Sequence, residues 1–233
     1  MFPSDLQALI FDFDRTLAPL GNFVKWREAL PLMREAYLRH GVPDELLDAA
    51  PRGCFGLYGH VARHASLPPA QMVEVQSEVS AILEEYEKVG VGRVELFAGV
   101  REMLDDLPGF GLRVGIVSSN PSAVIRPVLA QYGVEARFVA IVGREGIDHI
   151  KPDPESMRRC CERLSVDPAH CMGIGDNAGD AEAALAAGMS AVGVCTGVST
   201  REALLAAGVG EAFEDIRAFH AALRESRGAG RSG

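Results

Sequence analysis

The chain has 233 residues, of which 48% are hydrophobic and 24% are charged, as in ordinary globular proteins. Its formal net charge of −9 argues against a nucleic-acid partner and an anionic membrane partner, since both need a basic surface. No apolar run could span a bilayer, residues 1–5 do not open a signal peptide, and the five cysteines lack Cys-x-x-Cys spacing. We therefore expect a cytoplasmic protein with reduced thiols, and the sequence leaves open whether it is a monomer or a homodimer.

Apolar strand patterns alternate with helical patterns along most of the chain. Strands are predicted at residues 6–12, 112–118, 138–142, 171–175 and 191–195. Helices are predicted between and after them at residues 122–132, 154–164, 179–187 and 200–207. This alternation predicts an α/β fold, in which a doubly wound, Rossmann-like parallel sheet is covered by helices on both faces.

Residues 22–91 interrupt this alternation, because they show no good strand pattern. Helices are predicted there at residues 24–40, 43–49, 57–65 and 69–89. We therefore expect a core domain of residues 1–21 and 92–233, with an all-helical domain of residues 22–91 inserted into it. Residues 227–233 are small and polar, and we expect them to be a disordered tail.

Polar and charged side chains follow four of the predicted strands. Ligands bind beyond the carboxyl ends of the strands in open parallel sheets. At these ends the chain places Asp12 and Asp14, then Ser118, Ser119 and Asn120, then Lys151, and finally Asp176 and Asp180. Carboxylates near a core are costly unless they are paired or bind a metal. The sequence therefore predicts a magnesium-dependent phosphate site at this edge of the sheet.

The chemistry of phosphate monoesters gives these residues separate roles. Mg²⁺ prefers oxygen ligands, and Asp12 and Asp176 are candidates. Lys151 supplies a further positive charge and Ser118 a hydrogen bond to a phosphoryl oxygen. Asp12 would attack phosphorus to form an aspartyl-phosphate, while Asp14 would protonate the leaving oxygen and then activate water.

The order Asp-x-Asp-x-Thr, strand-end Ser, Lys-Pro and Gly-Asp-x-x-x-Asp resembles the haloacid dehalogenase superfamily. The helical insertion resembles the cap of its C1-capped members, such as phosphoglycolate phosphatase and β-phosphoglucomutase. The resemblance implies a Mg²⁺ ion held by Asp12, the Asp14 backbone carbonyl and Asp176, with Asp180 holding Lys151 or a metal-bound water. On this basis we assign the metal site to Asp12, Asp14, Asp176 and Asp180, catalysis to Asp12, Asp14, Ser118 and Lys151, and substrate binding to Thr16, Ser119, Asn120 and Arg52.

Two positions depart from the pattern of that superfamily. Arg15 stands between Asp14 and Thr16 where the family usually has glycine, and it removes no catalytic group. The acidic motif continues with Asn177 where Ser or Thr is commoner, and Asn177 can still form local hydrogen bonds.

We expect a magnesium-dependent phosphatase that acts on a small phosphorylated metabolite. A phosphomutase of the β-phosphoglucomutase type would use the same residues, and product analysis separates the two. A dehalogenase is disfavoured, because Asp14 has no role there, and a non-catalytic binding module would be expected to lack a catalytic group. Arg52 would contact the non-phosphoryl end of the substrate or be a solvent-exposed arginine. His60 and His64 lie four residues apart in a predicted helix, and we expect them to be ordinary packed histidines and not a pair of metal ligands.

Overall fold

The computed structural model describes residues 2–229 and contains a parallel sheet of six strands in the order β3-β2-β1-β4-β5-β6. The strands are β1 (Ala8–Phe11), β2 (Arg113–Val117), β3 (Ala140–Val142), β4 (Cys171–Gly175), β5 (Ser190–Val194) and β6 (Ala212–Phe213). All neighbouring pairs run parallel, and the order reverses at β1, as in doubly wound folds. The predicted fold class is therefore confirmed.

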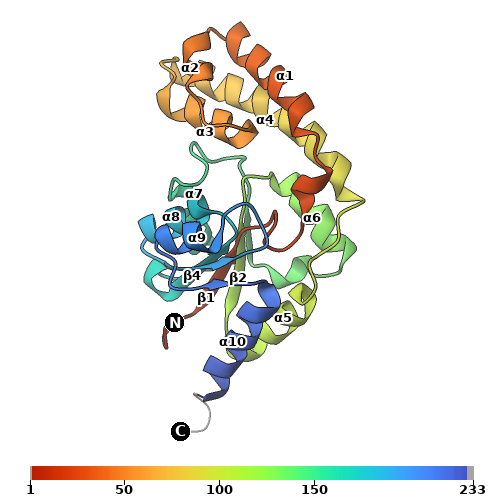
Figure 1. The fold of residues 1–233 in the computed structure, drawn as a ribbon, viewed down its shortest axis with the longest axis vertical. Helices are drawn as coiled ribbons and strands as arrows, with labels where there is room; N and C mark the ends of the chain where they lie inside the picture. The colour runs from red at the N-terminus through yellow and green to blue at the C-terminus, as the bar shows by residue number, and fades with distance from the viewer. Residues whose placement is uncertain (1, 230–233) are drawn as a thin grey trace.

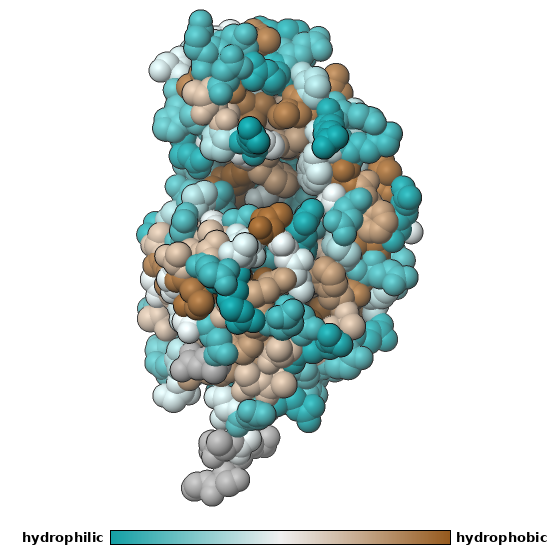
Figure 2. Space-filling model, viewed as in Figure 1, coloured by the Kyte–Doolittle hydropathy of each residue, from teal (hydrophilic) through white to brown (hydrophobic). Residues whose placement is uncertain are grey.

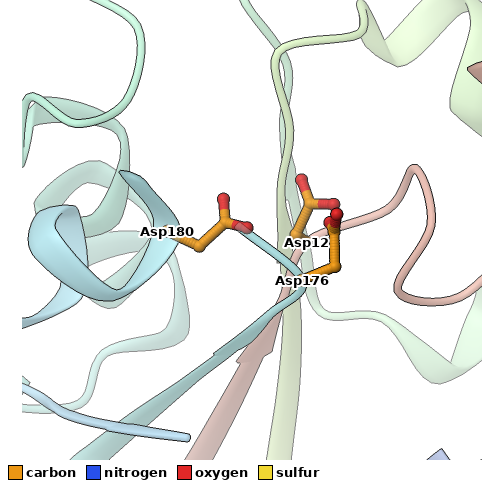
Figure 3. Close-up of side chains that lie close together, drawn as sticks. All are labelled: Asp12, Asp176 and Asp180. Carbon is orange, nitrogen blue, oxygen red and sulfur yellow. The ribbon is translucent and has the colours of Figure 1, made fainter. Parts of the chain in front are cut away.

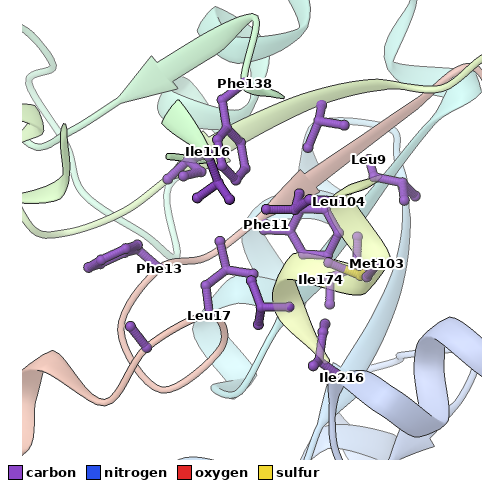
Figure 4. Close-up of a cluster of buried hydrophobic side chains, with 14 of the residues drawn as sticks. Leu9, Phe11, Phe13, Leu17, Met103, Leu104, Ile116, Phe138, Ile174 and Ile216 are labelled. Atoms are coloured by element: carbon purple, nitrogen blue, oxygen red, sulfur yellow. The ribbon is translucent and has the colours of Figure 1, made fainter. Parts of the chain in front are cut away.

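Side chains of β1 alternate between two hydrophobic clusters, because successive residues of a strand point to opposite faces. Leu9 and Phe11 pack with helices α5 (Val100–Asp106), α6 (Ser122–Gln131) and α10 (Ile216–Ala229) on one face (Figures 1 and 4). Ala8 and Ile10 pack with α7 (Glu155–Leu164), α8 (Ala178–Ala186) and α9 (Arg201–Ala206) on the other face. Burial on both faces explains why the β1 sequence Ala-Leu-Ile-Phe is apolar at every position.

The first four α-helices after β1 form a layer above the sheet, on the side of its carboxyl edge (Figure 1). They are α1 (Trp26–Arg39), α2 (Asp44–Asp48), α3 (Cys54–His64) and α4 (Pro69–Val91). These helices and the loops between them, which we call the helical segment, have their own buried cluster around Tyr37, Leu57 and Leu83. Short 3₁₀ helices occupy Leu20–Phe23, Leu107–Phe110, Glu135–Arg137 and Pro168–His170.

The end of the chain differs from the prediction. Residues 227–229, expected to begin a disordered tail, continue α10, and Arg227 donates a hydrogen bond to the Leu6 carbonyl at 3.0 Å. Residues 230–233 of the predicted tail lie outside the described residues. Helix α10 buries Ile216, Phe219 and Leu223 against the sheet, and this packing holds its first turns in place. Within residues 2–229, no helix is both long enough and apolar enough to cross a membrane.

Candidate active site

A cavity of about 470 Å³ lies between the carboxyl edge of the sheet and the helical segment. Figure 2 shows the hollowed surface between these two parts of the molecule. The core lines the cavity with Asp12, Asp14, Arg15, Ser118, Ser119, Asn120, Lys151, Asp176 and Asp180, and the helical segment adds Trp26, Arg52, Cys54 and Phe55. The four predicted strand-end groups thus meet at one place, because the carboxyl ends of parallel strands share one edge.

Three buried carboxylates form the floor of this cavity (Figure 3). Asp12, Asp176 and Asp180 each offer an oxygen, and these oxygens lie within 4.8 Å of one another. The Lys151 ammonium forms ion pairs with Asp12 Oδ1 at 2.6 Å and with Asp180 Oδ1 at 2.5 Å. One ammonium cannot neutralise three carboxylates, and carboxylate oxygens are the ligands that Mg²⁺ prefers. The donor set therefore fits a divalent cation.

Burial and mutual repulsion perturb the charges of this floor. Burial raises the pKa of Asp12 well above its usual range, although Lys151 opposes the shift, and Asp180 and Asp176 add repulsion. Burial and the neighbouring Asp180 raise the pKa of Asp176 to about 7. Burial alone would lower the pKa of Lys151, but Asp12 and Asp180 outweigh it and raise that pKa, so the ammonium stays charged.

Asp14 is held apart from the three carboxylates. Its Oδ1 accepts the Gly21 N–H at 2.7 Å, and a Cβ added at Gly21 would lie 2.5 Å from the other carboxylate oxygen. Burial raises the pKa of Asp14, while the Gly21 N–H and the charge of Arg15 oppose the shift. The structure therefore places the Asp14 carboxylate beside the metal-ligand candidates and keeps it out of their group.

Asp176 is oriented by hydrogen bonds from two different loops. Val198 donates its N–H to Oδ2 at 3.1 Å, and the Thr16 hydroxyl lies 3.4 Å from Oδ1. Thr16 is fully buried and is not among the residues that line the cavity, so its predicted role in substrate binding stays a prediction. The motif Asp-x-Asp-x-Thr brings the Thr16 hydroxyl under Asp176, where it supports a candidate metal ligand.

Asp180 has partners on both carboxylate oxygens. Besides the Lys151 ion pair on Oδ1, its Oδ2 accepts the Asn177 N–H at 3.1 Å. The Asn177 side chain in turn accepts the Gly179 N–H at 2.9 Å, which completes a capping box at the start of α8. Asn177, a departure from the family pattern, is thus the N-cap of α8, and Asp180 fixes Lys151.

The loop after β2 is tied to helix α4 by a buried ion pair. Arg144 and Glu87 both have fully buried side chains, and Arg144 Nη1 lies 2.8 Å from both Glu87 carboxylate oxygens. Glu87 also accepts the Asn120 side-chain N–H at 2.8 Å, and Asn120 Oδ1 accepts the Ser118 hydroxyl at 3.2 Å. Arg144 Nη1 donates to the Ser119 carbonyl at 3.0 Å. The Asn120 amide is therefore engaged within the protein, and its contribution is to fix the loop that presents Ser118.

The sequence pattern gave no signal for several of these groups. Glu87 reads as one more acid of a long helix, and Arg144 follows the short strand β3 in an ordinary loop. Gly21 and Val198 act through backbone N–H groups, which any residue type carries. Arg52, for which we predicted a contact with the substrate, is exposed and lines the cavity.

His60 and His64 lie on one face of α3 with ring centroids 4.6 Å apart. In the described part of the chain, the aspartate group is the one set of three or more candidate metal ligands that the structure brings together. The two histidines are thus left without a third ligand from residues 2–229.

Without divalent cations, the free energy of unfolding is expected to fall as the pH rises from the usual Asp176 value of 3.8 to about 7. In this range the unfolded chain has lost a proton that the folded protein retains, so ionisation favours unfolding, by at most about 1.4 kcal/mol per pH unit for one group. Urea denaturation in EDTA over this range would measure the effect. In an Asp176→Asn variant the free energy of unfolding should fall less over this pH range. If the free energy of unfolding fell equally with pH in variant and wild type, this account would be contradicted.

Residues 9–194 match the family model of haloacid dehalogenase-like hydrolases. The chain belongs to this family. The plasmid phosphoglycolate phosphatase of Cupriavidus necator is 31% identical over 92% of this chain and 85% of its own length. The N-acetylmuramic acid 6-phosphate phosphatase of Pseudomonas putida is 28% identical over 78% of this chain and 80% of its own length. The crystal structure of a hydrolase from Pseudomonas syringae matches the fold with a TM-score of 0.68 at 20% identity, over 94% of this chain and 98% of that one. The predicted family and enzyme class, a hydrolase of the phosphatase type, are confirmed.

Proposed function

We propose that this enzyme is a magnesium-dependent phosphatase that hydrolyses a small phosphorylated metabolite. The observation that carries the proposal is the meeting of Asp12, Lys151 and Asp176 on the floor of one cavity, with Asp14 held beside them. Asp12 and Asp176 would hold Mg²⁺ together with the Asp14 backbone carbonyl. The ion would offset the repulsion between the carboxylates and an incoming phosphoryl group.

The reaction would proceed in two displacements at phosphorus. The Asp12 carboxylate attacks the phosphorus atom, the bond to the ester oxygen breaks, and Asp14 gives its proton to that leaving oxygen. Asp14 then accepts a proton from water, the water oxygen attacks the aspartyl-phosphate, and inorganic phosphate leaves with Asp12 restored. The Lys151 ammonium and the Ser118 hydroxyl would hold the phosphoryl oxygens.

The raised pKa of Asp14 suits its proposed role. Burial favours the protonated carboxyl, which is the form that must protonate the leaving group in the first displacement. The Gly21 N–H hydrogen bond favours the ionised form, which must accept a proton from water in the second displacement. Burial and the Gly21 hydrogen bond shift the pKa of Asp14 in opposite directions, and this balance would let Asp14 serve both steps.

The helical segment would act as a cap that closes over the substrate and excludes bulk water. Trp26, Arg52 and Phe55 line the cavity from this segment, so they would contact the part of the substrate beyond the phosphoryl group. A cavity of about 470 Å³ suits a small metabolite. The relatives named above as phosphoglycolate and N-acetylmuramic acid 6-phosphate phosphatases support this class of substrate.

Mg²⁺ removal is expected to abolish phosphate release. The purified protein would be assayed for inorganic phosphate from p-nitrophenyl phosphate and a panel of phosphorylated metabolites, with Mg²⁺, with EDTA, and with Mg²⁺ restored. We expect turnover only with Mg²⁺, because Lys151 alone cannot offset the carboxylates at the site. Equal turnover in EDTA would overturn the metal assignment, and a sugar-phosphate isomer formed in place of inorganic phosphate would identify a phosphomutase.

A further inference from the structure

Arg15 adopts a backbone conformation that arginine rarely occupies. Its φ is +64°, in the left-handed region, and among residues 2–229 only Ser165 is another non-glycine residue with positive φ. This conformation is strained for an L-residue with a side chain, whereas glycine adopts it freely. The turn itself is fixed by the backbone, since the Arg15 N–H donates to the Ala18 carbonyl at 2.7 Å and Thr196 donates to the Arg15 carbonyl. A glycine would therefore serve the turn better, and the arginine side chain needs another explanation.

Burial of the Arg15 side chain does not supply that explanation. Arg15 is only half-buried, and it forms no ion pair with any carboxylate of residues 2–229. It lines the same cavity as Asp14, the residue that directly precedes it in the chain. Strained residues that persist without a packing reason cluster at functional sites.

A second guanidinium group without an ion pair among the described residues, that of Arg52, also lines the cavity. Arg52 lines it from the helical segment and is likewise without an ion-pair partner in the described chain, whereas Lys151 is bound by two carboxylates. The Lys151 charge is thus balanced inside the protein, and the charges of Arg15 and Arg52 are available to a ligand. Guanidinium groups bind carboxylates and phosphates through paired N–H donors.

We propose that Arg15, with Arg52 from the helical segment, binds a second anionic group on the leaving part of the substrate. The substrate is then a phosphate monoester that also carries a carboxylate or a further phosphate. This inference rests on the proposed phosphatase function and assigns the specificity of that site to a core residue between Asp14 and Thr16.

An Arg15→Gly variant tests the proposal, because it removes the charge and also relieves the backbone strain. The measurement is kcat/KM for two pairs of esters that differ in one anion: phosphoglycolate against ethyl phosphate, and fructose 1,6-bisphosphate against fructose 6-phosphate. We expect the preference for the anionic member of one pair to fall at least about 10-fold in Arg15→Gly, equivalent to about 1.4 kcal/mol of binding energy. The pair that responds identifies carboxylate or phosphate, and Arg15→Lys should keep part of the preference.

Ser165→Gly is the matched control, because it relieves the same kind of strain at the end of α7, outside the cavity. It should leave both preferences at the wild-type ratio. Unchanged ratios in Arg15→Gly, with or without a uniform loss of rate, would overturn the role of Arg15 while the phosphatase function stands. A wild-type enzyme that hydrolyses no phosphate ester would overturn the proposed function and this inference with it.

Discussion

An enzyme with asparagine in place of Asp12 is expected to hydrolyse phosphate monoesters at least about 10³-fold more slowly than the wild type. The side-chain amide cannot supply the anionic oxygen that attacks phosphorus. It also removes one candidate metal ligand and one partner of Lys151. Phosphate release from p-nitrophenyl phosphate at saturating Mg²⁺ would measure the loss.

The same substitution is not expected to weaken the fold. The Asp12 carboxylate is buried beside Asp176 and Asp180, and its raised pKa shows that its charge is disfavoured there. Lys151 keeps Asp180 as an ion-pair partner. Thermal unfolding without metal should therefore give a Tm equal to or above that of the wild type.

Asp105→Asn is a suitable control for Asp12→Asn. Asp105 is exposed and pairs with Arg137 at 2.6 Å, and neither residue lines the cavity. This variant should keep wild-type turnover. Substantial turnover in Asp12→Asn would rule out Asp12 as the nucleophile.

Replacing Glu87 with alanine is expected to lower the free energy of unfolding by about 3–5 kcal/mol. Glu87 and Arg144 are fully buried, so alanine would leave the guanidinium without a counter-charge in the interior. Asn120 would also lose the acceptor of its side-chain N–H. Urea denaturation would measure the change.

A double variant, Glu87→Leu with Arg144→Met, should be less destabilised than Glu87→Ala, because no unpaired charge stays buried. Arg126→Ala is the control, since it breaks an exposed pair with Glu135 and should cost less than about 1 kcal/mol. If Glu87→Ala lowered the free energy of unfolding as little as the control does, the buried pair would not hold α4 to the core.

The reaction residues could be predicted because each belongs to a local motif at a strand end. Asp12, Ser118 and Asp176 follow apolar runs that read as buried strands, and parallel pairing brings the ends of such strands to one edge. The contact between Thr16 and Asp176 was not predicted, because sequence alone does not say on which side of a turn a hydroxyl lies. The prediction missed β6, since two residues are too few to show a period.

Helices α5 and α10 were also missed. Val100–Asp106 is short, and Ile216–Ala229 follows a turn near a polar tail whose composition favoured disorder. Packing decided the outcome, because Phe219 and Leu223 become fully buried against the sheet. Burial of an apolar face stabilises a helix more than its intrinsic propensity does.

The sequence by itself determined the fold class, the family and the charged groups at the carboxyl edge of the sheet. These features rest on periodicity and on short motifs, which neighbouring residues encode. Only the tertiary structure decided which charge neutralises which: Lys151 lies between Asp12 and Asp180, Glu87 pairs with Arg144, and Arg15 faces the cavity without a partner among residues 2–229. The physical reason is that an ion pair depends on the distance between side chains and on their burial, and chain folding sets both for residues far apart in sequence.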